Sequence, residues 1–93
     1  MTYIKVFWKH SFLDEPILMY SELDENRNEI RKVEIYRGGM MGYAWRDISM
    51  NGTFLSESEI PELETINKDI QFEGVGIRKD EFDIIWKKAI KRK

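Results

Sequence analysis

The feature that most constrains the fold is an amphipathic segment near the end of the chain. Its apolar residues recur at the spacing of one helical face, at Phe82, Ile85, Trp86, Ala89 and Ile90. Acidic residues occupy its first turn and lysines its last, which complements the helix dipole. Such a helix must lie on another apolar surface, so the preceding residues have to provide one.

The start of the chain predicts that this surface is a β-sheet. Residues 3–10 alternate between the two sides of an extended chain, with Ile4, Val6 and Trp8 on one side. Pro16 suits the start of a second strand, because proline has no amide hydrogen to donate to a neighbouring strand. The sequence therefore indicates two consecutive strands joined by a polar turn.

Two further strands complete an expected antiparallel meander. Residues 27–37 favour a third strand because β-branched residues hold their apolar positions. The apolar positions change parity between Ile30 and Val33, which indicates a β-bulge. The glycine pair at 38–39 reads as a hairpin turn into a fourth strand over residues 41–46.

The second half of the chain carries weaker signals. The Asn-Gly pair at 51–52 predicts a turn, in either a loop or a hairpin with a brief strand at 53–55, and residues 61–68 predict two turns of helix. Residues 72–77 contain two glycines and fit either a strand or a loop. We expect residues 1–93 to form a single α+β domain, with an antiparallel four- or five-stranded sheet and a C-terminal helix packed on one face.

The composition excludes several classes of protein. The chain has no cysteine, which rules out disulfides and thiolate metal sites. Its apolar runs are far shorter than the roughly 20 residues of a membrane-spanning helix, and its start does not resemble a signal peptide. We therefore expect a cytoplasmic protein that does not associate with membranes.

The residues that usually perform catalysis are few. The single histidine, His10, lies near Ser11 and Asp14, but three residues crowded at the end of one strand rarely form a catalytic group. The stretch "DENRNE" at 24–29 lacks the central glycine and terminal glutamate of a calcium loop. We assign no catalytic residue, metal site or cofactor, and keep a small enzyme centred on His10 as an alternative.

The charges are unevenly distributed although the formal net charge is only -2. Basic residues gather at the end of the chain, at Lys87, Lys88, Lys91, Arg92 and Lys93, where they suit the C-terminus of a helix. The body of the chain is mostly acidic, which makes direct nucleic-acid binding unfavourable because phosphate backbones require a broad basic face. A nucleic-acid-binding module that uses an aromatic and basic strand face, including Trp45 and Arg46, remains an alternative.

Several strings resemble a family of small uncharacterised bacterial domains. These strings are "YIKVFWKH" from Tyr3, "DEP" from Asp14, "YSELD" from Tyr20, "RKVE" from Arg31 and "GYA" from Gly42, and the resemblance continues through "IPELETINKD" and "FEGVGIRKDEFDIIWKKA". Members of this kind look like immunity proteins of antibacterial toxin systems, including contact-dependent growth inhibition, whose toxins are often nucleases. The resemblance implies protein binding and no enzymatic activity.

Surface charge agrees with that implication, because an acidic surface complements the basic cleft of a nuclease. We expect the chain to bind a cognate protein toxin, a nuclease, and to occlude its active site. The expected contact residues are carboxylates with one exposed aromatic anchor: Asp24, Glu25, Glu57, Glu59, Glu62 and Trp45.

Overall fold

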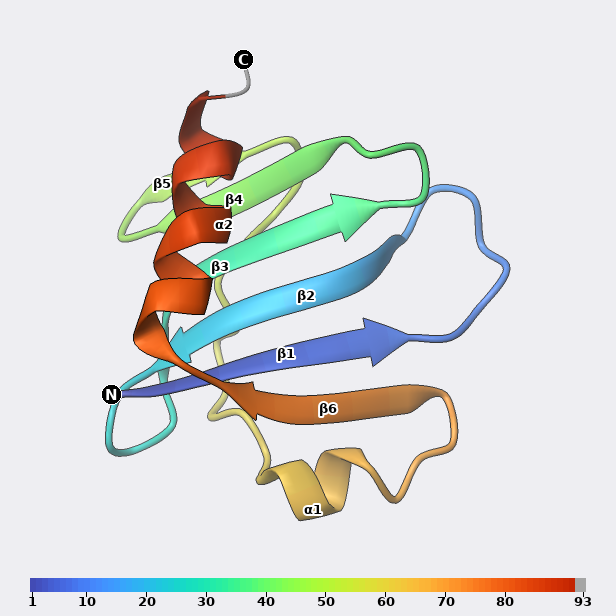
Figure 1. Ribbon diagram of the computed structural model, residues 1–93, viewed down its shortest axis with the longest axis vertical. Coiled ribbons are helices and arrows are strands. Elements are labelled where there is room, and N and C mark those ends of the chain that lie inside the picture. The colour runs from blue at the N-terminus through green and yellow to red at the C-terminus, as the bar shows by residue number, and fades with distance from the viewer. Residues whose placement is uncertain (92–93) are drawn as a thin grey trace.

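The chain forms one antiparallel sheet between two covering layers, shown in the computed structural model of Figure 1, which describes residues 1–91. The strands are β1 (Thr2–Trp8), β2 (Pro16–Leu23), β3 (Glu29–Tyr36), β4 (Met41–Trp45), β5 (Ile48–Met50) and β6 (Phe72–Ile77). Their order across the sheet is β5-β4-β3-β2-β1-β6. The first five strands are a meander, and β6 returns to pair with β1 at the far side.

The sheet has six strands, so the predicted number of four or five is wrong. Residues 53–55 form no strand, so the loop alternative holds there. The strand β5 precedes them, and because all three of its residues are exposed it carries no buried pattern. The strand alternative for residues 72–77 is confirmed. Gly74 interrupts the alternation of apolar residues that would have indicated a strand. A Cβ atom there would lie 2.9 Å from the Leu63 side chain, so the glycine allows α1 to pack closely on β6.

The predicted β-bulge is confirmed between β2 and β3. Glu22 pairs with Arg31 while Leu23 pairs with Glu29, which leaves Ile30 as the extra residue. The hairpin turn at 38–39 is confirmed as well, since Gly39 has a φ of +94° that favours glycine. The alternation of β3 therefore changes face at Ile30, as the sequence pattern indicates.

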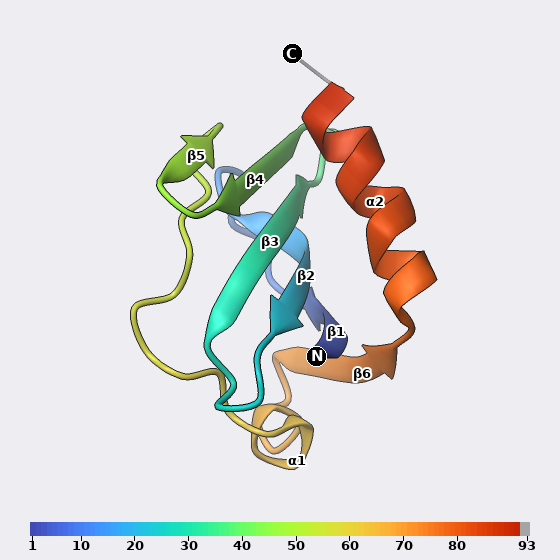
Figure 2. The ribbon, with the colours of Figure 1, turned by 90° about the vertical axis from the view of Figure 1, so that its left-hand side faces the viewer.

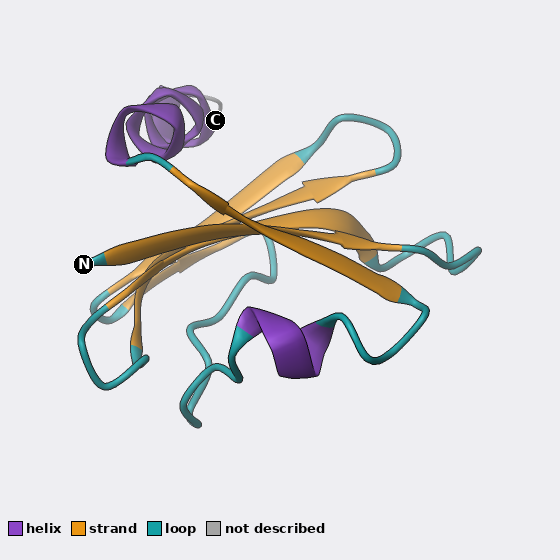
Figure 3. Ribbon diagram, turned by 60° about the horizontal axis from the view of Figure 1, so that its bottom comes forward, coloured by secondary structure: helices purple, strands orange, loops and turns teal. Residues whose placement is uncertain are grey.

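The helix α2 (Lys79–Lys91) lies across one face of the sheet, which confirms the C-terminal helix (Figure 3). Phe82 and Ala89 are fully buried, and Phe82 packs with Tyr3 in a core that includes Tyr20 and Val33. Of the basic C-terminal residues, Arg92 and Lys93 lie outside the described residues.

The opposite face is covered by residues 51–62, which we call the strap, and by the short helix α1 (Leu63–Ile66). Figure 2 shows the strap and α2 on opposite sides of the sheet. Ile60 and Ile66 pack against buried Ile4 in a second core. The helix predicted over 61–68 is shorter than expected, and Asn67 ends it.

Candidate protein-binding site

Glu29 of β3 anchors the strap from beneath. Its carboxylate accepts hydrogen bonds from the Ser56 backbone amide at 2.7 Å and from the Ser21 hydroxyl at 2.7 Å. The Lys32 ammonium lies 3.4 Å from the same carboxylate. Because the Glu29 side chain is almost fully buried, these three donors are what makes its charge tolerable inside the protein.

Two neighbouring charges of β3 continue this anchoring. The Glu34 carboxylate accepts a hydrogen bond of 2.8 Å from the Thr53 hydroxyl, and the Lys32 ammonium donates to the Phe54 carbonyl at 3.1 Å. Lys32 also lies 3.9 Å from Glu34. These strand charges therefore interact with partners inside the molecule, and their hydrogen bonds to Thr53 and Phe54 fix the path of the strap over the sheet.

Arg27 joins the β2–β3 turn to the end of the strap. Its backbone carbonyl accepts the Ile60 amide at 2.9 Å, and its guanidinium donates to the carbonyls of Ile60 at 2.8 Å and Pro61 at 2.7 Å. The guanidinium also lies 3.4 Å from the Glu62 carboxylate. The turn and the strap are consequently held together at one end of the sheet.

Asp24 has a local structural role in that turn. Its carboxylate accepts hydrogen bonds from the backbone amides of Asn28 and Asn26, each at 2.9 Å. The hydrogen bond from the Asn28 amide contributes most to lowering the pKa of Asp24 below its ordinary value. Asp24 therefore remains ionised near neutral pH, next to the exposed side chain of Glu25.

Two of the predicted carboxylates, Glu59 and Glu62, lie next to the turn that carries Asp24 and Glu25, and together with Glu57 further along the strap they form what we call the acidic edge. Glu59 and Glu62 flank the segment that Arg27 holds, and Glu57 precedes Glu59 by two residues on the same strap. All three glutamates are exposed. The members of the acidic edge are Asp24, Glu25, Glu57, Glu59 and Glu62.

Trp45 is less exposed than the sequence suggested for an aromatic anchor. It is half-buried on the α2 side of the sheet, where its ring meets Trp86 edge-on at 6.4 Å, and the Arg46 guanidinium lies 4.5 Å from its ring centre. The exposed aromatic on the strap is Phe54, which is 68% exposed. Sequence reasoning missed Phe54, although an aromatic among serines and glutamates without apolar neighbours at regular spacing was a usable signal.

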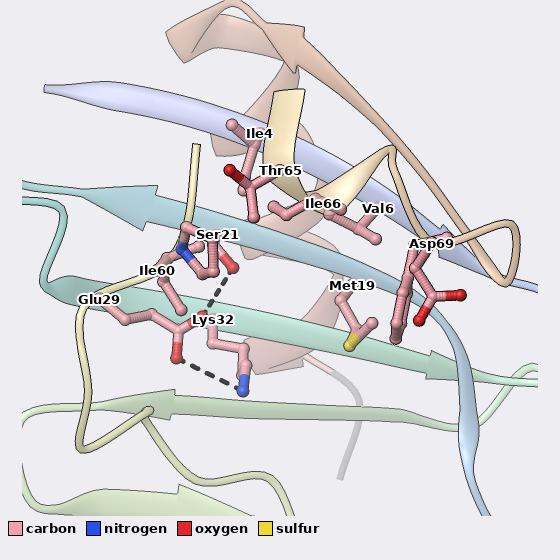
Figure 4. A pocket seen from close by; sticks show the side chains of 12 residues that line it. Ile4, Val6, Met19, Ser21, Glu29, Lys32, Ile60, Thr65, Ile66 and Asp69 are labelled. Atoms are coloured by element: carbon pink, nitrogen blue, oxygen red, sulfur yellow. Dashed lines mark hydrogen bonds and ion pairs between the residues drawn. The ribbon is translucent and has the colours of Figure 1, made fainter. Parts of the chain in front are cut away.

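An apolar groove, here called the strap groove, lies between the strap, α1 and the sheet (Figure 4). It has a volume of about 410 Å³. Its floor contains Ile4, Val6 and Met19, and its walls include Ile60, Pro61, Thr65, Ile66, Asp69 and Phe72. The paired polar groups of Ser21, Glu29 and Lys32 form one end.

His10 closes the loop between β1 and β2. The Phe12 amide donates to Nδ1 of His10 at 2.9 Å, so the hydrogen of the neutral ring lies on Nε2, which is 2.7 Å from the Pro16 carbonyl. Both ring nitrogens therefore serve the backbone, and the ring packs 4.2 Å from that of Trp8. Within residues 1–91, no group of three or more His, Asp or Glu side chains could hold a metal ion.

The aromatic and basic strand face lies beneath α2. The Arg31 guanidinium donates to Glu22 at 2.7 and 3.0 Å and to Asp83 at 3.2 Å, and it lies 4.8 Å from the Phe82 ring centre and 5.1 Å from that of Trp86. These contacts leave Arg31 poorly placed to meet a phosphate. Arg31 is therefore engaged inside the protein, between the sheet and α2.

Two pKa values reflect this network. The hydrogen bonds from Arg31 lower the pKa of Glu22, against the effect of burial, and the Tyr3 hydroxyl assists with a hydrogen bond of 2.9 Å. The Lys79 ammonium, 2.6 Å away, is the main cause of the lowered pKa of Asp83. Both carboxylates therefore help to fasten α2 to the sheet.

Comparison with known proteins identifies a family without assigning an activity. The model of a domain of unknown function, DUF6881, matches residues 2–91, and the chain belongs to this family. No curated protein and no solved structure matches the chain. Among the described residues, neither helix has the length and apolar composition needed to cross a membrane.

Proposed function

We propose that this member of the DUF6881 family is an immunity protein that binds a cognate toxin nuclease in the cytoplasm and occludes its active site. The observation that carries the proposal is the acidic edge. Between residues 51 and 66 the chain has four glutamates and no cation. Two of them, Glu59 and Glu62, lie beside the turn that holds Asp24 and Glu25, and Glu57 lies further along the strap near Phe54. Such a surface complements the basic cleft with which a nuclease holds its substrate.

A difference between the glutamates of the sheet and those of the strap supports this proposal. Glu22 pairs with Arg31, and Glu29 and Glu34 share Lys32. In contrast, Glu57 and Glu59 on the strap form no ion pair within residues 1–91. Carboxylates without such partners remain free to pair with a second molecule. Long-range attraction between opposite charges would also speed the encounter with a basic toxin.

An exposed aromatic next to these carboxylates supplies the other requirement of a tight interface. Phe54 is held outward because its own carbonyl is tied to Lys32, so the strap presents the ring without a large loss of loop entropy on binding. Large aromatic side chains are frequent centres of binding energy at interfaces. Phe54 takes the role that the sequence alone assigned to Trp45.

The experiment uses the protein encoded by the adjacent gene, because an immunity gene is expected beside its toxin gene. Binding and RNA cleavage are measured with the natural chain and with the variant Glu57→Gln/Glu59→Gln. We expect inhibition at equimolar protein, and an affinity loss of about tenfold in the variant, equivalent to about 1.4 kcal/mol. The loss should shrink at high salt, where exposed charges are screened.

A matched variant, Asp14→Asn/Glu15→Gln, removes the same charge from the exposed loop at the opposite end of the sheet. It should bind like the natural chain. Equal losses in the two variants would show that only net charge matters and would reject the acidic edge. If the natural chain neither binds nor inhibits the adjacent-gene protein, the proposed function is wrong.

A further inference from the structure

We propose that the strap groove is a second contact site for the toxin and that it receives a large apolar side chain flanked by lysine or arginine. This inference rests on the proposed function and names the chemistry of the segment that the partner contributes. It follows from three observations on the groove: its apolar floor, the saturation of its polar end, and the negative charge at its rim and in the surrounding segment (Figure 4).

The floor is suited to an apolar group. Ile4 and Val6 of β1 and Met19 of β2 form it, and Phe72 and Ile66 contribute to the walls. A volume of about 410 Å³ lies at the lower end of the range of ligand pockets and accommodates a large side chain. Filling the groove would remove apolar surface from water at about 25 cal/mol for each Å².

The polar end of the groove has little capacity left to orient a small molecule. The Ser21 hydroxyl donates to Glu29, whose carboxylate also receives the Ser56 amide, and Lys32 donates to the Phe54 carbonyl. Within the described residues, no buried side-chain nitrogen or oxygen lacks a hydrogen-bond partner. Small-molecule sites usually offer a few convergent polar groups with free capacity, which favours a protein segment here.

The rim of the groove and the chain segment around it favour a cationic partner. Between residues 57 and 69 the chain has five carboxylates and a single lysine. Asp69 lies at the rim, where one of its oxygens accepts the Gln71 amide at 2.9 Å. A basic residue next to the apolar anchor would therefore meet Asp69 at the rim and the glutamates of the surrounding segment, and a basic surface is what a protein that binds nucleic acid is expected to present.

The principal test closes the groove without altering the acidic edge. Thr65 is exposed on α1 and lines the groove, so Thr65→Trp places an indole across its mouth. We expect the affinity for the adjacent-gene protein to fall at least tenfold. The control Ser11→Trp adds the same side chain in an exposed loop that does not line the groove, and it should bind like the natural chain.

A second variant protects the test against misfolding of the first. Asp69→Asn keeps the oxygen that accepts the Gln71 amide but removes the charge from the rim, and we expect a several-fold loss of affinity. Circular dichroism and urea denaturation establish that each variant is folded. Unchanged affinity in both folded variants would overturn the inference.

Failure of this inference is distinguishable from failure of the proposed function. If Glu57→Gln/Glu59→Gln weakens binding while Thr65→Trp does not, the groove is not a contact and the acidic edge remains one. Native mass spectrometry of the chain alone tests the other occupants. A bound small molecule, or a dimer, that disappears in Thr65→Trp would assign the groove to that occupant and overturn the proposal.

Discussion

Replacing Arg31 by methionine should destabilise the protein strongly, because Arg31 is the shared partner of Glu22 and Asp83. The substitution keeps most of the apolar stem but removes the guanidinium, together with its two hydrogen bonds to Glu22 at 2.7 and 3.0 Å. Glu22 is 7% exposed and would retain only the Tyr3 hydroxyl as a donor. Its carboxylate would then be a buried charge without a cation.

The magnitude follows from that burial. Breaking a buried ion pair by removing one partner costs about 3–5 kcal/mol, and the remaining Tyr3 hydrogen bond places Arg31→Met at the lower end, near 3 kcal/mol. A domain of 93 residues has a stability of roughly 5–14 kcal/mol, so the loss is a large part of the total. Urea denaturation followed by tryptophan fluorescence measures it, since Trp86 lies beside the guanidinium.

Two controls define the result that would refute this reasoning. Arg78→Met removes an exposed ion pair with Asp80, and it should change the free energy of unfolding very little, because solvent screens such a pair. Adding Glu22→Gln to Arg31→Met should restore part of the stability, because no unpaired carboxylate is then buried. A cost for Arg31→Met no greater than that for Arg78→Met, or a double variant less stable than Arg31→Met, would contradict the assigned role.

Two further predictions concern acid and the strap. The pKa values of Glu22 and Asp83 are lowered on folding, so their contribution is present above the ordinary carboxyl range near pH 4 and is lost as the pH falls through the lowered values. The urea midpoint should therefore drop from pH 5 to pH 3, less steeply in Glu22→Gln; equal drops would contradict this origin. Gly42→Ala should lower the free energy of unfolding by about 1–3 kcal/mol in urea denaturation, because its Cβ would collide with the Thr53 hydroxyl and lie 2.9 Å from the Met50 carbonyl. A Cβ at Gly38 would meet nothing within 4 Å, so Gly38→Ala should lower it much less.

The parts of the fold that the sequence predicts are those in which one face is buried and the other is not. The α2 stripe satisfies that condition, and so does the parity change at Ile30. The strand β1 satisfies it only in part, because Val6 is buried and Phe7 exposed but Tyr3 and Ile4 are both buried, on opposite faces. The strand β5 does not, because it is exposed on every residue, and β6 replaces side chains with glycine where α1 approaches. Both strands are therefore fixed by tertiary contacts that a local pattern does not contain.

The negative charge of the candidate site could be predicted from the sequence, but the presence of a groove could not. The glutamates of the strap are visible as a run without cations, whereas the strap groove exists only because residues 51–66 fold back across the sheet. The placement of Trp45 could have been inferred, since it has the same strand parity as Tyr43, and both rings pack on Trp86. Its burial follows from that shared face.

The division of charge within the molecule connects the fold to the proposed binding. Strand glutamates such as Glu22 and Glu29 would resist burial, but Arg31 and Lys32 satisfy them, so the same interactions that fasten α2 and the strap also remove these charges from the surface. The electrostatic field around the strap side of the molecule then comes mainly from carboxylates outside the sheet. Substitutions in the two buried networks should consequently change stability, whereas substitutions on the acidic edge should change affinity at nearly constant stability.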